Sequence, residues 1–270
     1  SLISEVKNDN SKKEFYLTDI VSIANLKNMM VVPLLSKETN SLLGVNDKLQ
    51  LEETEQIYQS NNRKKFLRQG VTMLDSKSVF FKGDVEIGED VEIEANVIFE
   101  GNVKLDDKVQ IKSNTIIKNS VISSGTEVKP YTIIEDSLVG KNCNIGPFAR
   151  IRPNSTLEES VGIGNFVEVK ASNIKKNTKA NHLTYLGDSD IGENVNVGAG
   201  VITCNYDGVN KHKTVIKDNV FIGSDSQLIA PIIVEEGVTI AAGSTITDNS
   251  EKDSLLIARS RQQEKKNWKR

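Results

Sequence analysis

Aliphatic residues recur every six positions through most of the chain, and this period limits the possible folds more than any other feature. Four phases carry it, over residues 87–117, 139–169, 185–203 and 216–246. Between the first two phases, residues 122–134 keep the same period with two slips of one residue. A helix repeats every 3.6 residues and a half-buried strand every two, so neither produces a period of six.

A triangular coil does produce this period, if each side is a short strand with one large aliphatic residue pointing inward. One turn then takes about eighteen residues, and successive turns stack about 4.8 Å apart. Only 5% of the residues are aromatic, and a core of small branched residues suits stacked parallel strands. The sequence therefore predicts a mainly β fold, a parallel β-helix of hexapeptide repeats.

Glycine and asparagine recur near the expected corners of this coil, where tight turns require backbone conformations that both residues adopt at low cost. We expect the corner glycines to provide these conformations. They are Gly88, Gly101, Gly140, Gly146, Gly164, Gly192, Gly198 and Gly223.

Residues 1–70 lack the six-residue period and form a separate region. We expect a short α/β segment followed by a linker helix over residues 47–69, with Gly70 as its stop. The apolar contacts of that helix are predicted to be Leu49, Ile57, Phe66 and Leu67. The solenoid is predicted over residues 71–250, and a polar, basic tail that leaves it over residues 251–270.

Charge and composition exclude several classes of protein. The formal net charge is −3, whereas nucleic-acid binders usually carry a basic excess. No apolar run reaches the roughly 18 to 20 residues that span a bilayer, and residues 1–6 do not resemble a secretion signal. Cys143 and Cys204 are the two cysteines, and we expect them to be reduced in a cytoplasmic protein.

Chemistry is expected where the repeat is irregular. The spacing is sixteen rather than eighteen from residue 169 to 185, and thirteen rather than twelve from 203 to 216, where a loop is expected to project. Each irregularity contains one of the two histidines. His182 is a candidate general base or a structural histidine, and His212, between two lysines, is expected to be a solvated surface residue.

Two basic residues, Arg152 and Lys170, are eighteen positions apart and should stack one coil apart. Two cations about 5 Å apart repel unless an anion such as a phosphate monoester bridges them. The alternative is that both are outward, solvated charges. Ser224 and Ala242 are also eighteen apart, and small residues in register leave room for an extended ligand.

At these residues the chain resembles a known family, the bacterial bifunctional N-acetylglucosamine-1-phosphate uridyltransferase/glucosamine-1-phosphate acetyltransferase. The resemblance extends over essentially the whole chain and implies a left-handed coil, against the usual right-handed crossover. The matching stretches are Gly146-Pro147-Phe148-Ala149-Arg150-Ile151-Arg152-Pro153, Gly164-Asn165-Phe166-Val167-Glu168-Val169-Lys170, His182-Leu183-Thr184-Tyr185-Leu186-Gly187-Asp188, Gly198-Ala199-Gly200-Val201-Ile202-Thr203-Cys204-Asn205-Tyr206-Asp207-Gly208, Phe221-Ile222-Gly223-Ser224 and Ile240-Ala241-Ala242-Gly243.

The resemblance implies an acetyl transfer from acetyl-CoA to the amine of glucosamine-1-phosphate, a step toward UDP-N-acetylglucosamine and the bacterial cell wall. It makes His182 the general base. Acceptor-binding residues would be Arg152, Lys170, Tyr185 and Asn196. Residues that bind acetyl-CoA would be Ala199, Asn205, Tyr206, Ser224, Ala242 and Arg259. The resemblance also implies a homotrimer with acetyl-CoA between neighbouring prisms.

The chain departs from the family at its front, because it carries no glycine-rich phosphate loop and only the end of a nucleotidyltransferase domain. In the complete enzyme the residue that matches Asn46 would help bind magnesium and the uridine nucleotide. We therefore expect no uridyl transfer by this chain.

Other functions stay open at this point. The nearest is an acyltransferase of the same architecture with another acceptor. A carbonic anhydrase of this coil type needs three histidine ligands, so a carboxylate would have to replace one. A scaffold without catalysis would not bind acetyl-CoA. A route through an acetylated Cys204 is a further alternative to direct transfer.

Overall fold

A computed structural model describes residues 1–35 and 43–268 of the chain. They divide into two compact units, Ser1–Glu55 and Gln56–Arg270. The helices are η1 (Leu2–Glu5), α1 (Asp19–Leu26), α2 (Lys48–Arg68) and η3 (Ser76–Ser78).

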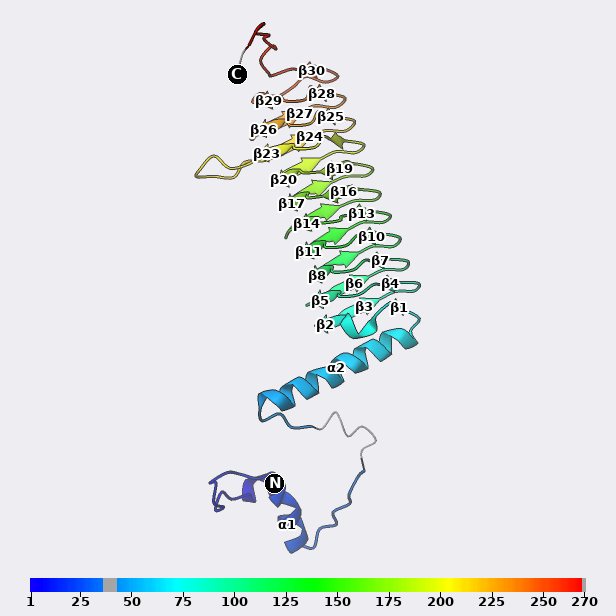
Figure 1. The fold of residues 1–270 in the computed structure, drawn as a ribbon. Helices are drawn as coiled ribbons and strands as arrows, with labels where there is room; N and C mark the ends of the chain where they lie inside the picture. Colours follow the sequence, from blue (N-terminus) through cyan, green and yellow to red (C-terminus); the bar gives the residue numbers. More distant parts are fainter. Residues whose placement is uncertain (36–42, 269–270) are drawn as a thin grey trace. The chain divides into compact units, whose positions relative to one another are not determined.

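The second unit is a left-handed parallel β-helix of about 10 turns, as the sequence predicts. Its strands form three parallel sheets of 11, 10 and 9 strands, here sheets A, B and C. From β1 to β29 every third strand belongs to the same sheet, so each turn of the chain adds one strand to each side, and β30 then follows β28 in sheet A (Figure 1).

Most strands are two or three residues long. Sheet A contains β1 (Thr72–Met73), β4 (Glu92–Ile93), β7 (Gln110–Ile111), β10 (Glu127–Val128), β13 (Asn144–Ile145), β16 (Gly162–Asn165), β19 (Lys179–His182), β22 (Asn196–Val197), β25 (Phe221–Ile222), β28 (Thr239–Ile240) and β30 (Leu255–Leu256). Sheet B contains β2 (Phe80–Lys82), β5 (Ile98–Glu100), β8 (Ile116–Lys118), β11 (Ile133–Glu135), β14 (Arg150–Ile151), β17 (Glu168–Lys170), β20 (Tyr185–Gly187), β23 (Ile202–Cys204), β26 (Gln227–Ile229) and β29 (Thr245–Ile246). Sheet C contains β3 (Val85–Ile87), β6 (Val103–Leu105), β9 (Val121–Ile122), β12 (Leu138–Val139), β15 (Thr156–Leu157), β18 (Asn173–Ile174), β21 (Ser189–Ile191), β24 (Thr214–Ile216) and β27 (Ile232–Val234).

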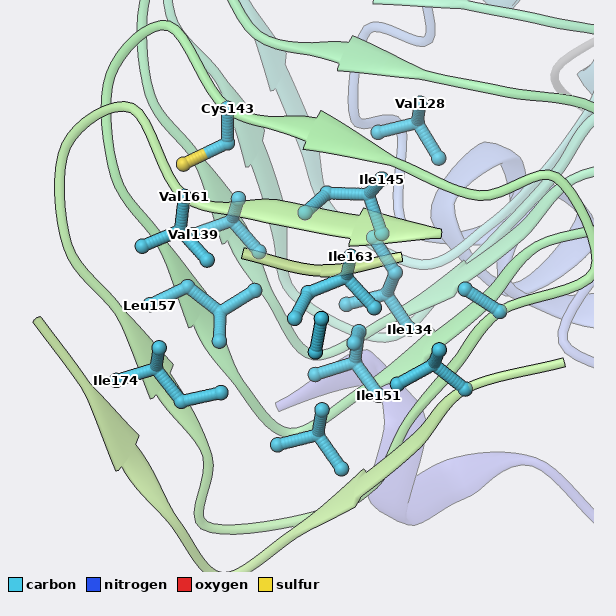
Figure 2. Close-up of a cluster of buried hydrophobic side chains, with 14 of the residues drawn as sticks. Val128, Ile134, Val139, Cys143, Ile145, Ile151, Leu157, Val161, Ile163 and Ile174 are labelled. Atoms are coloured by element: carbon cyan, nitrogen blue, oxygen red, sulfur yellow. The ribbon is translucent and has the colours of Figure 1, made fainter. Parts of the chain in front are cut away.

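The core lies inside the coil, where each side contributes one large aliphatic residue (Figure 2). Ile145, Ile151 and Leu157 come from the three sides of one turn, and each is at most 1% exposed. The next turn repeats the arrangement in register, with Ile163 paired to Ile145. Burial of these side chains, worth about 25 cal/mol per Å² of apolar surface, stabilises the stack.

Of the third predicted phase only Tyr185 is displaced, by one residue, whereas Ile191, Val197 and Thr203 are buried as predicted. Leu186 is fully buried, while Tyr185 lies on the outer face of β20 and is partly exposed. Side chains alternate between the two faces of a strand, so Leu186, not Tyr185, takes the core position. The step from Val169 to Leu186 is therefore seventeen residues, so the irregularity predicted before His182 is a slip of one residue rather than two.

The one-residue slips in the six-residue period all occur at the corner between sheets B and C. Core residues are five apart there in four turns, and each of these corners has a serine: Ser120, Ser137, Ser172 and Ser189. Each hydroxyl donates to the backbone carbonyl two residues earlier, at 2.6 to 2.8 Å. The residue before each serine has a φ of 43° to 49°. A serine-closed corner thus removes one residue from the turn.

Glycine contributes to the corners differently from our expectation. Six of the eight predicted corner glycines do not have positive φ; only Gly101 and Gly146 do. Most left-handed conformations fall on other residues, chiefly asparagine and aspartate. At Gly164 a Cβ atom would lie 1.9 Å from the carbonyl oxygen of Asn181 in the next turn. Glycine is required there because the coils approach closely.

Helix α2 packs on the first turn of the solenoid. The side chain of Gln59 accepts from Phe81 N at 2.9 Å and donates to Phe81 O at 2.8 Å, as a neighbouring strand would. Arg63 donates to Val79 O at 3.1 Å, and the Phe66 ring lies 4.9 Å from the Phe81 ring. The predicted contact Phe66 is confirmed, whereas Leu49 and Leu67 are exposed. Gly70, at φ 93°, follows the end of the helix.

The first unit contains η1 and α1 and, in its described residues, no strand. At the other end of the chain, β30 pairs with β28, so the solenoid continues past residue 250. Residues 36–42 and 269–270, which fall in the predicted first region and tail, lie outside the described residues. None of the described helices is both long and apolar enough to cross a membrane.

Candidate active site

The outer face of sheet B carries a group of charged residues on successive strands. Arg150 and Glu168 are in register on β14 and β17, so Arg152 and Lys170 stack one turn apart, as their spacing predicts. Each cation has its own carboxylate: Arg152 Nη1 lies 2.7 Å from Glu168 Oε1, and Lys170 Nζ lies 3.2 Å from Asp188 Oδ2. These ion pairs replace the bridging anion that the spacing suggested.

A third cation, Lys211, reaches the same place from the loop after β23. Its amino group contacts that of Lys170, and this contact, together with Asp188, raises the pKa of Lys170. The contact with Lys170 lowers the pKa of Lys211. Lys211 therefore adds a third basic side chain beside the pair formed by Lys170 and Asp188.

Asp188 joins Lys170 to Asn205, a residue predicted to bind acetyl-CoA that the structure places beside the predicted acceptor-binding residue Tyr185. Asn205 Nδ2 donates to Asp188 Oδ2 at 2.5 Å and lies 3.5 Å from the hydroxyl of Tyr185. The Tyr185 hydroxyl lies over Gly187, where a Cβ atom would be 2.4 Å from it. The structure thus brings Arg152, Lys170 and Tyr185 onto one face of sheet B.

His182 lies at the edge of this face, at the corner between sheets A and B. Its side chain is exposed, and its Nδ1 is 2.9 Å from Asn165 Oδ1 on the preceding turn. The peptide N–H of Leu183, the corner residue, donates to Asn165 O at 3.0 Å. A histidine held in this way on a rigid strand can present its other ring nitrogen to a bound substrate.

The side chains at the corner next to His182 are aromatic on the preceding turns and small on the following turns. On the turns before it stand Tyr131, Phe148 and Phe166, with ring centroids 4.8 and 5.4 Å apart and about half of each side chain's surface exposed. On the turns after it the corresponding corner segments hold Ala199, Ser224 and Ala242. Backbone bonds tie these segments in sequence: Gly200 N to Leu183 O, Asp225 N to Ala199 O, and Gly243 N to Ser224 O. The predicted acetyl-CoA residues at these corners therefore form a column of small side chains that starts at His182.

Two further predicted residues flank this column. Asn196 is exposed on β22, in register with Lys179 on the strand that ends at His182. Arg259, in the predicted tail, donates from Nη1 to Ala242 O at 2.7 Å.

The loop of residues 204–213 projects from the solenoid between β23 and β24 (Figure 1). It is closed by its own contacts: Asp207 accepts from the backbone of Val209 and Asn210, and His212 Nε2 lies 2.6 Å from Asp207 Oδ2. The bonds from Asn210, His212 and Val209 hold the pKa of Asp207 far below its usual value. His212 therefore makes a structural contact within the loop. Tyr206, a predicted acetyl-CoA residue in the same loop, is 60% exposed.

Neither cysteine is activated as a nucleophile. Burial raises the pKa of Cys143 to about 11, and burial also raises the pKa of Cys204. A thiol needs a lowered pKa to attack at neutral pH, so direct transfer is favoured over an acetylated Cys204.

Asn46, which the resemblance relates to magnesium in the complete enzyme, has a local contact here. The side chain of Asn46 donates to Gln50 Oε1 at 3.2 Å, just before α2. Among residues 1–35 and 43–268 there is no group of three or more His, Cys, Asp or Glu side chains that could hold a metal ion.

Four residues of this face were not predicted as site residues: Asn165, Glu168, Asp188 and Lys211. Asn165, Glu168 and Asp188 lie in stretches that carry the resemblance, and each is within a turn of a predicted residue. Lys211 lies in an irregular loop, so no repeat spacing relates it to Lys170.

Comparison with known proteins agrees with this architecture. Residues 81–165 match the family model of the GMPPB C-terminal domain, and residues 213–248 match that of the bacterial transferase hexapeptide. Similar solved structures include LpxA from Acinetobacter baumannii (17% identity, 66% of this chain and 67% of that chain, TM-score 0.36). Others are LpxA, a UDP-N-acetylglucosamine acyltransferase from Bacteroides fragilis (16%, 68% and 68%, TM-score 0.38), and the Arabidopsis UDP-N-acetylglucosamine acyltransferase (13%, 69% and 69%, TM-score 0.33). The second family model is a repeat of bacterial transferases, and it agrees with the six-residue repeat of the solenoid.

Proposed function

We propose that this chain transfers an acetyl group from acetyl-CoA to the amine of glucosamine-1-phosphate. The observation that carries the proposal is the cluster of Arg152, Lys170 and Lys211 on the face of sheet B that borders His182. Three cations against the two carboxylates Glu168 and Asp188 leave an excess of positive charge, which suits a phosphate group. We assign the amine on the neighbouring sugar carbon to the side of the histidine.

The reaction needs a neutral amine. The amine nitrogen attacks the thioester carbonyl, and His182 takes its proton as the C–N bond forms, a contribution of roughly 10² to 10⁴ in rate. Collapse of the tetrahedral intermediate breaks the C–S bond, and the proton passes to the departing CoA sulfur. The products are N-acetylglucosamine-1-phosphate and CoA, and no metal ion takes part in these steps.

We assign acetyl-CoA, the acetyl donor, to the column of small side chains that starts at His182. Side chains as small as Ala199, Ser224 and Ala242 leave space for the extended arm of acetyl-CoA, and Arg259 offers a positive charge beside the last of them. Gly198 N and Gly200 N donate to Ile222 O and Leu183 O, which leaves Ala199 N–H as the candidate donor to the oxyanion. Asn205 and Tyr206 complete this assignment from the loop.

We also propose that the active molecule is a cytoplasmic homotrimer. The loop of residues 204–213 is held to its own coil near both ends and projects between them (Figure 1), so we assign its outer part to the site of a second copy. Light scattering on the purified chain tests this arrangement: a monomer at micromolar concentration contradicts it.

An acyltransferase with another acceptor is the second candidate, because the same column of small residues would bind its donor. The first experiment measures free CoA released from acetyl-CoA with glucosamine-1-phosphate, glucosamine or a nucleotide-linked aminosugar as acceptor. Release that requires glucosamine-1-phosphate, and falls about 10²-fold or more in His182→Ala, supports the proposal. Release that is independent of the phosphate supports the second candidate.

A matched control comes from the opposite corner of the coil. Asn177 donates from its side chain to Asn194 at 3.1 Å, in a polar stack between sheets C and A. Asn177→Ala should retain the parental rate, because it loses a corner bond without touching the site. Loss of activity in both variants would show a general effect on folding and would remove the support for His182.

A further inference from the structure

The pair of strands that ends at His182 is longer than the other strands in the described residues. β16 and β19 have four residues each, whereas the others have two or three. The added length extends their register to a pair formed by Asn165 and His182. Neighbouring strands therefore hold these two side chains side by side.

Several contacts fix this pair in place. Leu183 N donates to Asn165 O at 3.0 Å, and the hydroxyl of Thr184 donates to His182 O at 2.7 Å. Gly164, before Asn165, lets the two turns approach so closely that no Cβ atom would fit. The backbone of both residues is thus restrained, and the side-chain distance of 2.9 Å between His182 Nδ1 and Asn165 Oδ1 follows from it.

The contact determines which ring nitrogen can act. An amide oxygen only accepts hydrogen bonds, so the His182 nitrogen that faces it carries the proton. In a neutral imidazole the other nitrogen then has a free lone pair. Asn165 is uncharged, so it orients the ring without placing a second carboxylate beside a phosphosugar.

We propose that Asn165 is a positioning residue: its amide oxygen holds His182 with Nδ1 protonated, so that Nε2 accepts the proton of the attacking amine. The role of Nε2 rests on the proposed acetyl transfer, whereas the tautomer does not. Asn165 itself touches neither the amine nor the thioester.

The tautomer is measured directly on the full chain. Only two histidines are present, so ¹⁵N-histidine labelling gives two ring systems, and His212→Ala assigns them. The parent should show His182 as the Nδ1–H tautomer at a pH where the ring is neutral. Asn165→Ala should show a mixture of both tautomers. A His182 ring that is already protonated on Nε2 in the parent would overturn the proposal.

Kinetics test the consequence for catalysis. Asn165→Ala should lower kcat by roughly 10- to 100-fold, with the KM of both substrates within about threefold of the parent. Asn165→Asp, whose carboxylate accepts the same Nδ1 proton, should keep the parental tautomer and recover most of the rate. Asn177→Ala controls for loss of a corner asparagine.

The two proposals fail in different ways. If the parent does not acetylate glucosamine-1-phosphate, the proposed function fails, while the ¹⁵N spectra still test the contact with Asn165. If the parent is active but Asn165→Ala has the parental kcat, or Asn165→Asp is as slow as Asn165→Ala, the positioning role is wrong.

Discussion

At the scale of single residues, the contact between Lys170 and Lys211 determines the charge that an anionic acceptor meets. The contact lowers the pKa of Lys211, so its ammonium form is lost at lower pH than that of an isolated lysine. A bound phosphate dianion opposes this loss, because it favours the charged form of both lysines.

Substitution of Lys211 should therefore weaken acceptor binding in a pH-dependent way. In the parent, the contribution of Lys211 is complete below its lowered pKa and is lost as pH rises through it. We expect Lys211→Met to raise the KM for glucosamine-1-phosphate roughly tenfold near pH 7, with less effect at alkaline pH. Steady-state kinetics from pH 7 to 10 measure this.

Lys213 provides the control on the same loop. Its amino group pairs with Asp190 on β21, whereas Lys170 pairs with Asp188. Lys213→Met should leave the KM within about twofold of the parent. An equal rise in both variants would mean that the net charge of the loop, rather than the Lys170–Lys211 contact, controls binding.

A second residue-scale prediction concerns two fully buried threonines at corners. Thr132 Oγ1 has no hydrogen-bond partner among the described residues, whereas Thr126 Oγ1 donates to Gly140 O and accepts from Cys143 N. We expect Thr132→Val to be neutral or stabilising and Thr126→Val to cost about 1–3 kcal/mol in unfolding free energy. Denaturant titration compares them, and a loss of stability in Thr132→Val as large as that in Thr126→Val would contradict the difference.

At the scale of elements, helix α2 covers the first turn of the solenoid, in the position that a preceding turn would occupy. Phe66→Ala removes the ring that packs against Phe81 and should lower the unfolding free energy by about 3–5 kcal/mol. Leu49→Ala, at a position on the same helix that is 68% exposed, should change it by less than about 0.5 kcal/mol. Equal effects in a denaturant titration would mean that Phe66 does not anchor the helix.

Elements also show which parts of the fold the sequence could predict. The coil follows from the six-residue period because one inward side chain per strand is a strict requirement of packing. Tyr185 was misplaced because the slip occurs at the serine corner of residues 171–173, and a five-residue step cannot be located from aliphatic spacing alone. Two of the buried residues of α2, Gln59 and Arg63, were missed because they are buried to satisfy backbone groups rather than to bury apolar surface.

The site was predictable to a similar degree and for similar reasons. Arg152 and Lys170 are related by one turn of the coil, so their stacking could be predicted, and the resemblance supplied roles for His182 and Tyr185. The contact of Lys211 depends on the path of an irregular loop. The contact of Asn165 depends on two strands being longer than their neighbours, which the six-residue period does not show.

At the scale of the molecule, the two units should differ in stability. In the described residues of the first unit only Ala24 is buried, whereas the solenoid has a continuous core. Amide hydrogen exchange followed by mass spectrometry should show residues 1–35 exchanging within seconds and the strands of sheets A to C protected for hours. Protection of α1 equal to that of the strands would contradict this order.

The bonds between α2 and the first turn also bear on self-assembly. A stack of parallel strands exposes unpaired N–H and C=O groups at its end, and such an edge can add strands from another chain. Gln59 and Arg63 occupy the groups of Phe81 and Val79 that an incoming strand would use. Helix α2 thus caps the open end of the solenoid. We expect a chain without this helix to polymerise end to end through its exposed strand edge.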